Sequence, residues 1–262
     1  MEGSFVNSAL LRPEGGTLML QASGGVTNSG LIELQPGSRL HVVENWNNLG
    51  QVQMAGGALS GGQVQNGSTG LISGFGLIDG PVTNAGLLSV SGGSLSVSGS
   101  LANSGITHLG GTGNQLTGAG VLTNTGTVQG AGNVGMRVAN SGTLEAIVGT
   151  LSFSALSNTN TATGTLVAGT GGKLLMTQGL ATNAGLIQLG GGTYDNAGAA
   201  MANGPHRGRR HTAVGHHHQH QPDRVQLRRE QYRRRHRQSG GGQAHREQRC
   251  PGHVRVSRDQ RR

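Results

Sequence analysis

Acidic side chains are the first candidates for chemistry, because two carboxylates placed together can act as general acid and base on a glycosidic bond. Glu14 and Glu33 lie 19 residues apart, so they stack on one face if the chain repeats at that length. Single acidic side chains on a protein surface usually only contact water. We therefore predict no catalytic residue and no enzyme activity. The acids before residue 205 are Glu2, Glu14, Glu33, Glu44, Asp79, Glu145 and Asp195.

Other residue types that carry chemistry stand apart from one another. Trp46, within the cluster from Glu44 to Asn48, is either a carbohydrate-stacking residue or a loop tryptophan packed on its own turn, and we favour the second. His41 and His108 have no visible partners, so we interpret them as ordinary surface residues.

Two further patterns suggest ligand sites but lack the residues that those sites need. Thr159, Thr161 and Thr163 alternate as in ice-binding ladders, but neighbouring segments lack the same triplet. The glycine runs 110–113 and 190–192 are not followed by Lys-Ser/Thr or by a helical pattern, so they predict no phosphate site. We expect no cofactor and no metal site in this part of the chain.

Composition limits the kind of fold that can hold these residues. The chain has 262 residues, of which 50 are Gly and 33% are hydrophobic, against about 45–50% in ordinary globular domains. No apolar run approaches the roughly 18 residues of a membrane-spanning helix, and Met1-Glu2-Gly3-Ser4 lacks the basic start of a signal peptide. The single cysteine, Cys250, cannot form an internal disulfide, so the redox compartment stays open.

The chain joins two compositions near Pro205. Residues 1–205 hold four basic and seven acidic residues, a balance of 4 − 7 = −3. Residues 206–262 hold sixteen Arg and four acids, a balance of 16 − 4 = +12. We therefore divide the chain into a repeat array over 1–204 and an Arg/His-rich, disordered tail over 205–262.

The array repeats an Asn-x-Gly triplet, with degenerate copies at Asn7, Asn66 and Asn160. The mean spacing from Asn7 to Asn183 is (183 − 7)/9, or about 19.6 residues. Asn and Gly both tolerate positive φ, so we predict that the triplet forms a corner between strands. The corner residues are Asn28, Gly30, Asn48, Gly50, Asn84, Gly86, Asn103, Gly105, Asn124, Gly126, Asn140, Gly142, Asn183 and Gly185, with a further copy at Asn196-Ala197-Gly198.

Short strands are predicted between these corners. Leu88/Val90 and Leu95/Val97 alternate with small or polar residues, the period of a strand with one buried face. A corner every 19–20 residues with two or three strands between corners predicts an all-β, single-stranded parallel β-helix of about ten turns, in which corner asparagines stack as an amide ladder. Gly-rich disorder and an antiparallel sandwich or barrel are the alternatives, but neither requires identical corners at one spacing.

Segments 70–88 and 120–128 resemble the repeats of autotransporter passenger domains and filamentous-haemagglutinin-like adhesins of bacteria. The resemblance is one of repeat style and covers about residues 5–200. It implies a right-handed parallel β-helix, an extracellular or cell-surface location, an adhesive or structural role, and glycans or proteins on host or neighbouring cells as partners. This chain departs from the family in showing no signal peptide, secretion domain or outer-membrane barrel. The corner at Asn7 leaves no room for a capping element, so we expect both ends to be uncapped cuts in a longer protein.

The tail has two interpretations. Its Arg pairs suggest nucleic-acid binding and His216–His220 suggests a metal site, provided that the tail is genuine. In GC-rich codons, however, Ala-Asn-Ser-Gly translated one frame away gives Glu-Gln-Arg, which occurs at 247–249. We therefore hypothesise that the tail is frameshifted repeat sequence. The favoured function is that of a surface-protein fragment; the alternatives are a polysaccharide lyase or hydrolase and a nucleic-acid binder.

Overall fold

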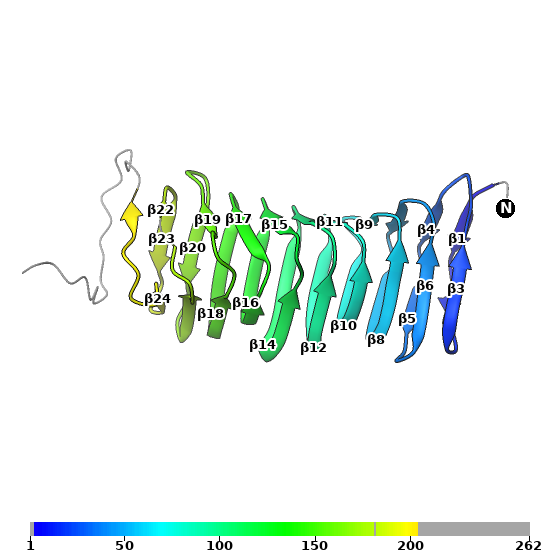
Figure 1. Ribbon diagram of the computed structural model, residues 1–262, viewed down its shortest axis with the longest axis horizontal. Helices are drawn as coiled ribbons and strands as arrows, with labels where there is room; N and C mark the ends of the chain where they lie inside the picture. The colour runs from blue at the N-terminus through cyan, green and yellow to red at the C-terminus, as the bar shows by residue number, and fades with distance from the viewer. Residues whose placement is uncertain (1–2, 181, 204–262) are drawn as a thin grey trace, which may run out of the picture. The chain divides into compact units, whose positions relative to one another are not determined.

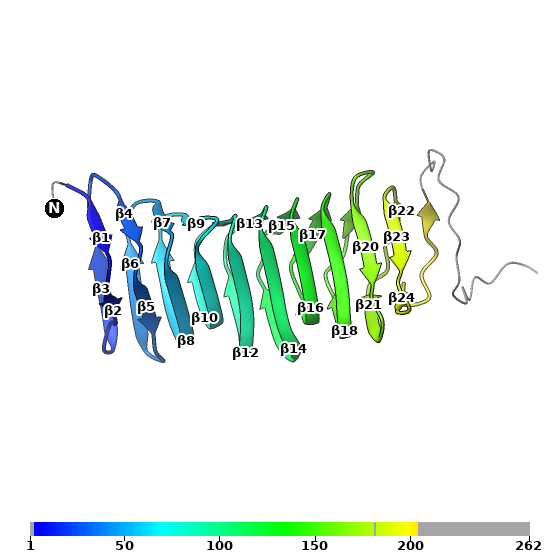
Figure 2. The same ribbon diagram turned by 180° about the vertical axis from the view of Figure 1, so that it is seen from behind.

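A computed structural model describes residues 3–180 and 182–203, and the hypotheses about the tail lie outside these residues. The described chain contains no helix, and therefore none that crosses a membrane. It winds through about ten turns of a parallel β-solenoid, with strands stacked in a row from β1 (Phe5–Asn7) to β25 (Ala202–Asn203), as Figures 1 and 2 show from opposite sides. The prediction of an all-β parallel solenoid is confirmed.

One side of the solenoid is an 11-stranded parallel sheet of short strands, which we call the ladder sheet. Each strand pairs with the equivalent strand of the next turn, so Val82-Thr83-Asn84 lies in register with Leu101-Ala102-Asn103. Its strands are β1, β4 (Val26–Asn28), β7 (Trp46–Asn48), β9 (Val64–Asn66), β11 (Val82–Asn84), β13 (Leu101–Asn103), β15 (Val121–Asn124), β17 (Arg137–Asn140), β19 (Thr159–Asn160), β22 (Thr182–Asn183) and β25.

The other side is a 14-stranded sheet, which we call the long sheet. In the middle turns one long strand runs through a bend, and in the outer turns the same path is split into two strands. Its strands are β2 (Leu10–Leu11), β3 (Gly16–Leu20), β5 (Leu31–Leu34), β6 (Ser38–Val42), β8 (Gln51–Gly61), β10 (Leu71–Asp79), β12 (Leu87–Val97), β14 (Ile106–Thr117), β16 (Thr127–Val134), β18 (Thr143–Phe153), β20 (Thr165–Ala168), β21 (Gly172–Met176), β23 (Leu186–Leu189) and β24 (Thr193–Asp195).

Glycine makes the bend of the long sheet possible. The register between β8 and β10 shifts between Phe75 and Leu77, next to Gly56 and Gly74. These glycines have φ of 96° and 106°, values that a residue with a Cβ rarely adopts. Bulges at the equivalent place in later turns let turns of different length share the same two sheets.

The core is a column of aliphatic side chains inside the coil. Along β12 the side chains of Leu88, Val90, Leu95 and Val97 are fully buried, while residues between them face outward. The same inward positions in the neighbouring turns are Leu, Val or Ile with few exceptions, because stacked turns bring like residues into contact. A narrow interior of this kind has little room for aromatic rings.

Candidate functional site

Ten buried asparagines form a continuous amide ladder along one corner of the solenoid. The Nδ2 of each donates to the Oδ1 of the next at 2.6–2.8 Å, and all nine bonds run in the same direction along the chain. The ladder consists of Asn7, Asn28, Asn48, Asn66, Asn84, Asn103, Asn124, Asn140, Asn160 and Asn183.

Each ladder amide also donates to a backbone carbonyl of its own turn, of the next turn, or of both. The Nδ2 of Asn28 donates to the Gly30 carbonyl at 3.2 Å and to the Gln51 carbonyl at 3.0 Å. The same pattern recurs at Asn124, with bonds to Gly126 and Thr143. Ladder asparagines therefore donate hydrogen bonds to backbone carbonyls as well as to the next asparagine. An amide group can make all of these bonds, which explains why the corner needs one.

The corner glycines lie where the sequence places them, but the predicted reason for them was wrong. The ladder asparagines and the glycines that follow them do not adopt positive φ; only the copy at 196–198 does, with φ of 75° at Gly198. A Cβ on Gly86 would instead overlap the carbonyl oxygens of Gly67 and Gly70 in the preceding turn. The same backbone approach from the turn below excludes a side chain at Gly30, Gly50, Gly105, Gly126, Gly142 and Gly185.

Asn196 was wrongly grouped with the ladder corners. Its Oδ1 accepts the Leu180 backbone N–H at 2.7 Å, so it lies at the corner that leads into the ladder sheet. Asn158 has the equivalent role two turns earlier, accepting from the Val138 N–H at 2.8 Å, and sequence reasoning missed it. The degenerate copies Asn66 and Asn160 do belong to the ladder, with Gly70 and Gly164 in the place of the usual corner glycine.

The two acids at 19-residue spacing are not stacked. This turn is 21 residues long, because Leu11 of β2 pairs with Ile32 of β5. The next position therefore brings Arg12 beside Glu33, and the two side chains form an ion pair. Glu14 lies exposed in the connection that follows β2.

Two further carboxylates, those of Asp79 and Asp195, each have partners of their own and lie on different turns. Asp79 accepts a bond from the Ser98 hydroxyl at 2.9 Å and lies 3.8 Å from Arg39. Asp195 pairs with Lys173 at 2.7 Å, and hydrogen bonds from Lys173 and from the Ala197 N–H lower the pKa of its carboxyl group. Burial, with Asp195 nearby, raises the pKa of the Tyr194 hydroxyl. Within the described residues, His, Cys, Asp and Glu form no group of three or more that would hold a metal ion.

Trp46 is neither a carbohydrate-stacking residue nor a loop residue. It begins β7, is 1% exposed, and pairs in register with Val26 and Val64 on either side. An indole therefore replaces valine in the core. His41 contacts the Ser60 hydroxyl at 3.1 Å, whereas Nδ1 of half-buried His108 has no hydrogen-bond partner in the described structure.

The outward face of the ladder sheet carries a stripe of mostly polar, uncharged side chains, one from each of the nine strands from β1 to β19. Thr159 belongs to this stripe and lies opposite Ala139. Thr163 lies in the tight corner that follows β19, so the three threonines do not form a flat triplet. The stripe contains Val6, Thr27, Asn47, Gln65, Thr83, Ala102, Thr123, Ala139 and Thr159.

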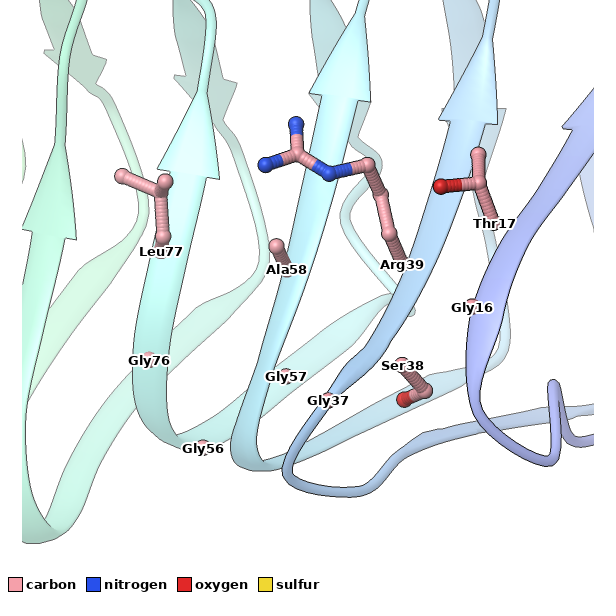
Figure 3. A pocket seen from close by; sticks show the side chains of 10 residues that line it. All are labelled: Gly16, Thr17, Gly37, Ser38, Arg39, Gly56, Gly57, Ala58, Gly76 and Leu77. Carbon is pink, nitrogen blue, oxygen red and sulfur yellow. The ribbon is translucent and has the colours of Figure 1, made fainter.

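An open groove of about 410 Å³ follows the bend of the long sheet across four turns. Its floor is glycine backbone, including Gly16, Gly37 and Gly57, and Figure 3 shows the Arg39 side chain passing Ala58 and pointing away from these glycines. A guanidinium beside exposed backbone can contact a ligand weakly, but the carboxylate pair needed for glycoside hydrolysis is not among the lining residues.

Comparisons with known proteins do not identify a family for this chain. No family model, curated protein or solved structure matches the chain.

Proposed function

We propose that the chain is part of an exported bacterial surface protein and serves as a structural or adhesive rod without a catalytic centre. The observation that carries the proposal is the uncharged stripe on the ladder sheet, backed by an unbroken ladder of ten asparagines. At about 4.8 Å per turn, nine stripe residues extend over roughly 40 Å. Such a surface offers repeated weak contacts rather than one binding pocket.

Two further observations support the absence of catalysis. The carboxylates of Glu33, Asp79 and Asp195 are each engaged by a separate cation on a different turn. The groove at the bend is lined by glycine, with Arg39 as the charged side chain. Acid/base chemistry on a polysaccharide needs two carboxylates facing one substrate bond.

The adhesive role is tested with the full chain, fluorescently labelled and applied to glycan-coated surfaces and to bacterial and animal cells. We expect the wild-type chain to bind at least one of these surfaces. The variant Thr83→Glu/Thr123→Glu/Thr159→Glu places charge on the stripe and should bind much less. The matched variant Ser73→Glu/Ser89→Glu/Gln129→Glu, on the outer face of the long sheet, should bind normally.

Three results would count against the proposal. Failure of the wild-type chain to bind any surface contradicts the adhesive role. Resistance of the protein to protease on intact cells that produce it contradicts surface exposure. Release of sugar fragments from a polysaccharide panel by the purified chain contradicts the absence of a catalytic centre.

A further inference from the structure

Asn66 differs from the other nine ladder asparagines in that a glycine follows it directly. A glycine at that position leaves the next backbone nitrogen unhindered, so Asn-Gly is the sequence in which an asparagine side chain is most easily attacked by its own backbone. Ser, Leu, Ala or Thr follows the other nine, and the side chain of each partly shields that nitrogen. The ladder therefore contains one member with distinct chemistry.

We propose that Asn66-Gly67 is a deamidation site that the folded ladder keeps closed and that unfolding opens. In the reaction the Gly67 nitrogen bonds to Cγ of Asn66, the Cγ–Nδ2 bond breaks, and ammonia leaves with the proton lost from Gly67. The product is a cyclic imide. Water then adds to one ring carbonyl and the bond from that carbon to the Gly67 nitrogen breaks, which gives aspartate after attack at Cγ and isoaspartate after attack at the Asn66 backbone carbonyl, without an oxidant or a reductant.

The folded structure holds both reacting groups in place. The Gly67 N–H donates to the Asn48 carbonyl at 2.9 Å, so the nucleophile is engaged by the turn below. The Asn66 Nδ2 donates to Asn84 Oδ1 at 2.7 Å, and its Oδ1 accepts from Asn48 at 2.7 Å. Ring closure would have to break these bonds.

Solvent and flexibility are also restricted at this site. Asn66 is 2% exposed, so water has little access to the side-chain carbonyl. The turn that follows is fixed by the Gly70 N–H bond to the Gly67 carbonyl and by the Thr69 hydroxyl bond to the Leu49 carbonyl, both at 2.9 Å. Reaction from the folded state thus requires local opening, and its rate falls with the population of the open form.

The product does not fit the place that Asn66 leaves. Aspartate lacks the Nδ2 donor for Asn84 and for the Gly70 and Leu87 carbonyls. Isoaspartate also lengthens the backbone at the last residue of β9, which displaces the corner 67–70 that leads into β10. A reacted chain should therefore refold poorly at its fourth turn.

The test incubates the full chain at mildly alkaline pH, folded in buffer and unfolded in urea, and follows residue 66 by peptide mapping with separation of isoaspartate. We expect conversion at Asn66 to be roughly 100-fold faster in urea. Asn84, buried in the same ladder but followed by Ala85, is the internal control and should stay intact in both samples. Refolding yield should fall in parallel with the converted fraction.

Gly67→Ala is the matched variant. Its Cβ would approach Leu49 Cδ2 at 2.6 Å, but that side chain is 48% exposed and can move, and φ at Gly67 is not positive. The variant should fold and should react much more slowly in urea. Equal rates in buffer and urea, no reaction in urea, equally fast reaction of Gly67→Ala, or undiminished refolding of converted chains would each overturn the proposal.

Discussion

At the scale of single residues, the ladder depends on an amide at every position. Asn84 donates to Asn103 Oδ1 at 2.7 Å and to the Ile106 carbonyl at 2.9 Å, and it is 1% exposed. Asn84→Asp keeps the shape but removes the donor, so the Ile106 carbonyl loses this bond and Asn103 Oδ1 keeps only the bond from the Thr107 hydroxyl. We expect the free energy of unfolding, measured in urea, to fall by at least about 2 kcal/mol.

The pH dependence of this variant has a definite sign. Burial should raise the pKa of the introduced carboxyl group in the folded state, so the folded state favours the protonated form. The loss of stability should then be largest at neutral pH and shrink as the pH falls, because a protonated carboxyl can donate again. Asn47→Asp, on an exposed strand position, is the control, and an equal loss there would contradict the role of the ladder.

A second residue-scale prediction concerns the corner glycines. Gly86→Ala forces a Cβ against the carbonyls of Gly67 and Gly70, and we expect a loss of about 3 kcal/mol in urea unfolding. Gly113→Ala has no atom within 4 Å of the added Cβ and no positive φ, so its stability should stay unchanged or rise slightly. If the two variants are equally stable, close stacking is not what requires glycine at the corner.

At the scale of elements, β7 gives a spectroscopic test of the fold. Trp46 is the single tryptophan of the chain and is 1% exposed. Its fluorescence should be blue-shifted, resist quenching by acrylamide, and shift to the red when urea unfolds the solenoid. Red-shifted, easily quenched emission in native buffer would show that the core does not contain the indole.

The pairing of β21 with β24 should respond to acid. The pKa of Asp195 is lowered in the folded state, chiefly by the hydrogen bond from Lys173. Its contribution to stability is present above the carboxyl pKa of the unfolded chain, about 3.9, and is lost as the pH falls through the lower folded value. The protection of β24 amides, measured as exchange relative to the intrinsic rate at each pH, should therefore fall below about pH 4, and Asp195→Asn should remove most of this pH dependence.

The strands were largely predictable because equivalent positions in successive turns carry similar residues. An asparagine ends each ladder-sheet strand and is followed in most turns by x-Gly, and the spacing of this Asn-x-Gly triplet predicted the parallel solenoid. The neighbour of Glu33 was not predictable in this way. Turn lengths vary from 16 to 23 residues, so a mean period assigns the wrong neighbour to a single side chain. The burial of Trp46 was not predicted, because it follows from the valines at the same position in adjacent turns. Nothing in the local sequence around Trp46 shows this.

At the scale of the whole solenoid, each turn contacts mainly its two neighbours, so cooperativity depends on every interface. Breaking two successive ladder positions with Asn84→Asp/Asn103→Asp should uncouple the turns on either side. We expect the urea transition to broaden and its m-value to fall, since the two halves then unfold separately. A transition as steep as that of the wild-type chain would show that the sheets alone carry the coupling.

The common direction of the ladder bonds has an electrical consequence. Backbone groups in a strand point alternately toward both neighbours, so their dipoles nearly cancel. The side-chain amides do not alternate: all nine bonds direct N–H toward the turn that follows. Their dipoles add, as peptide dipoles do in a helix, and give the solenoid a positive pole toward Asn183 and a negative pole toward Asn7.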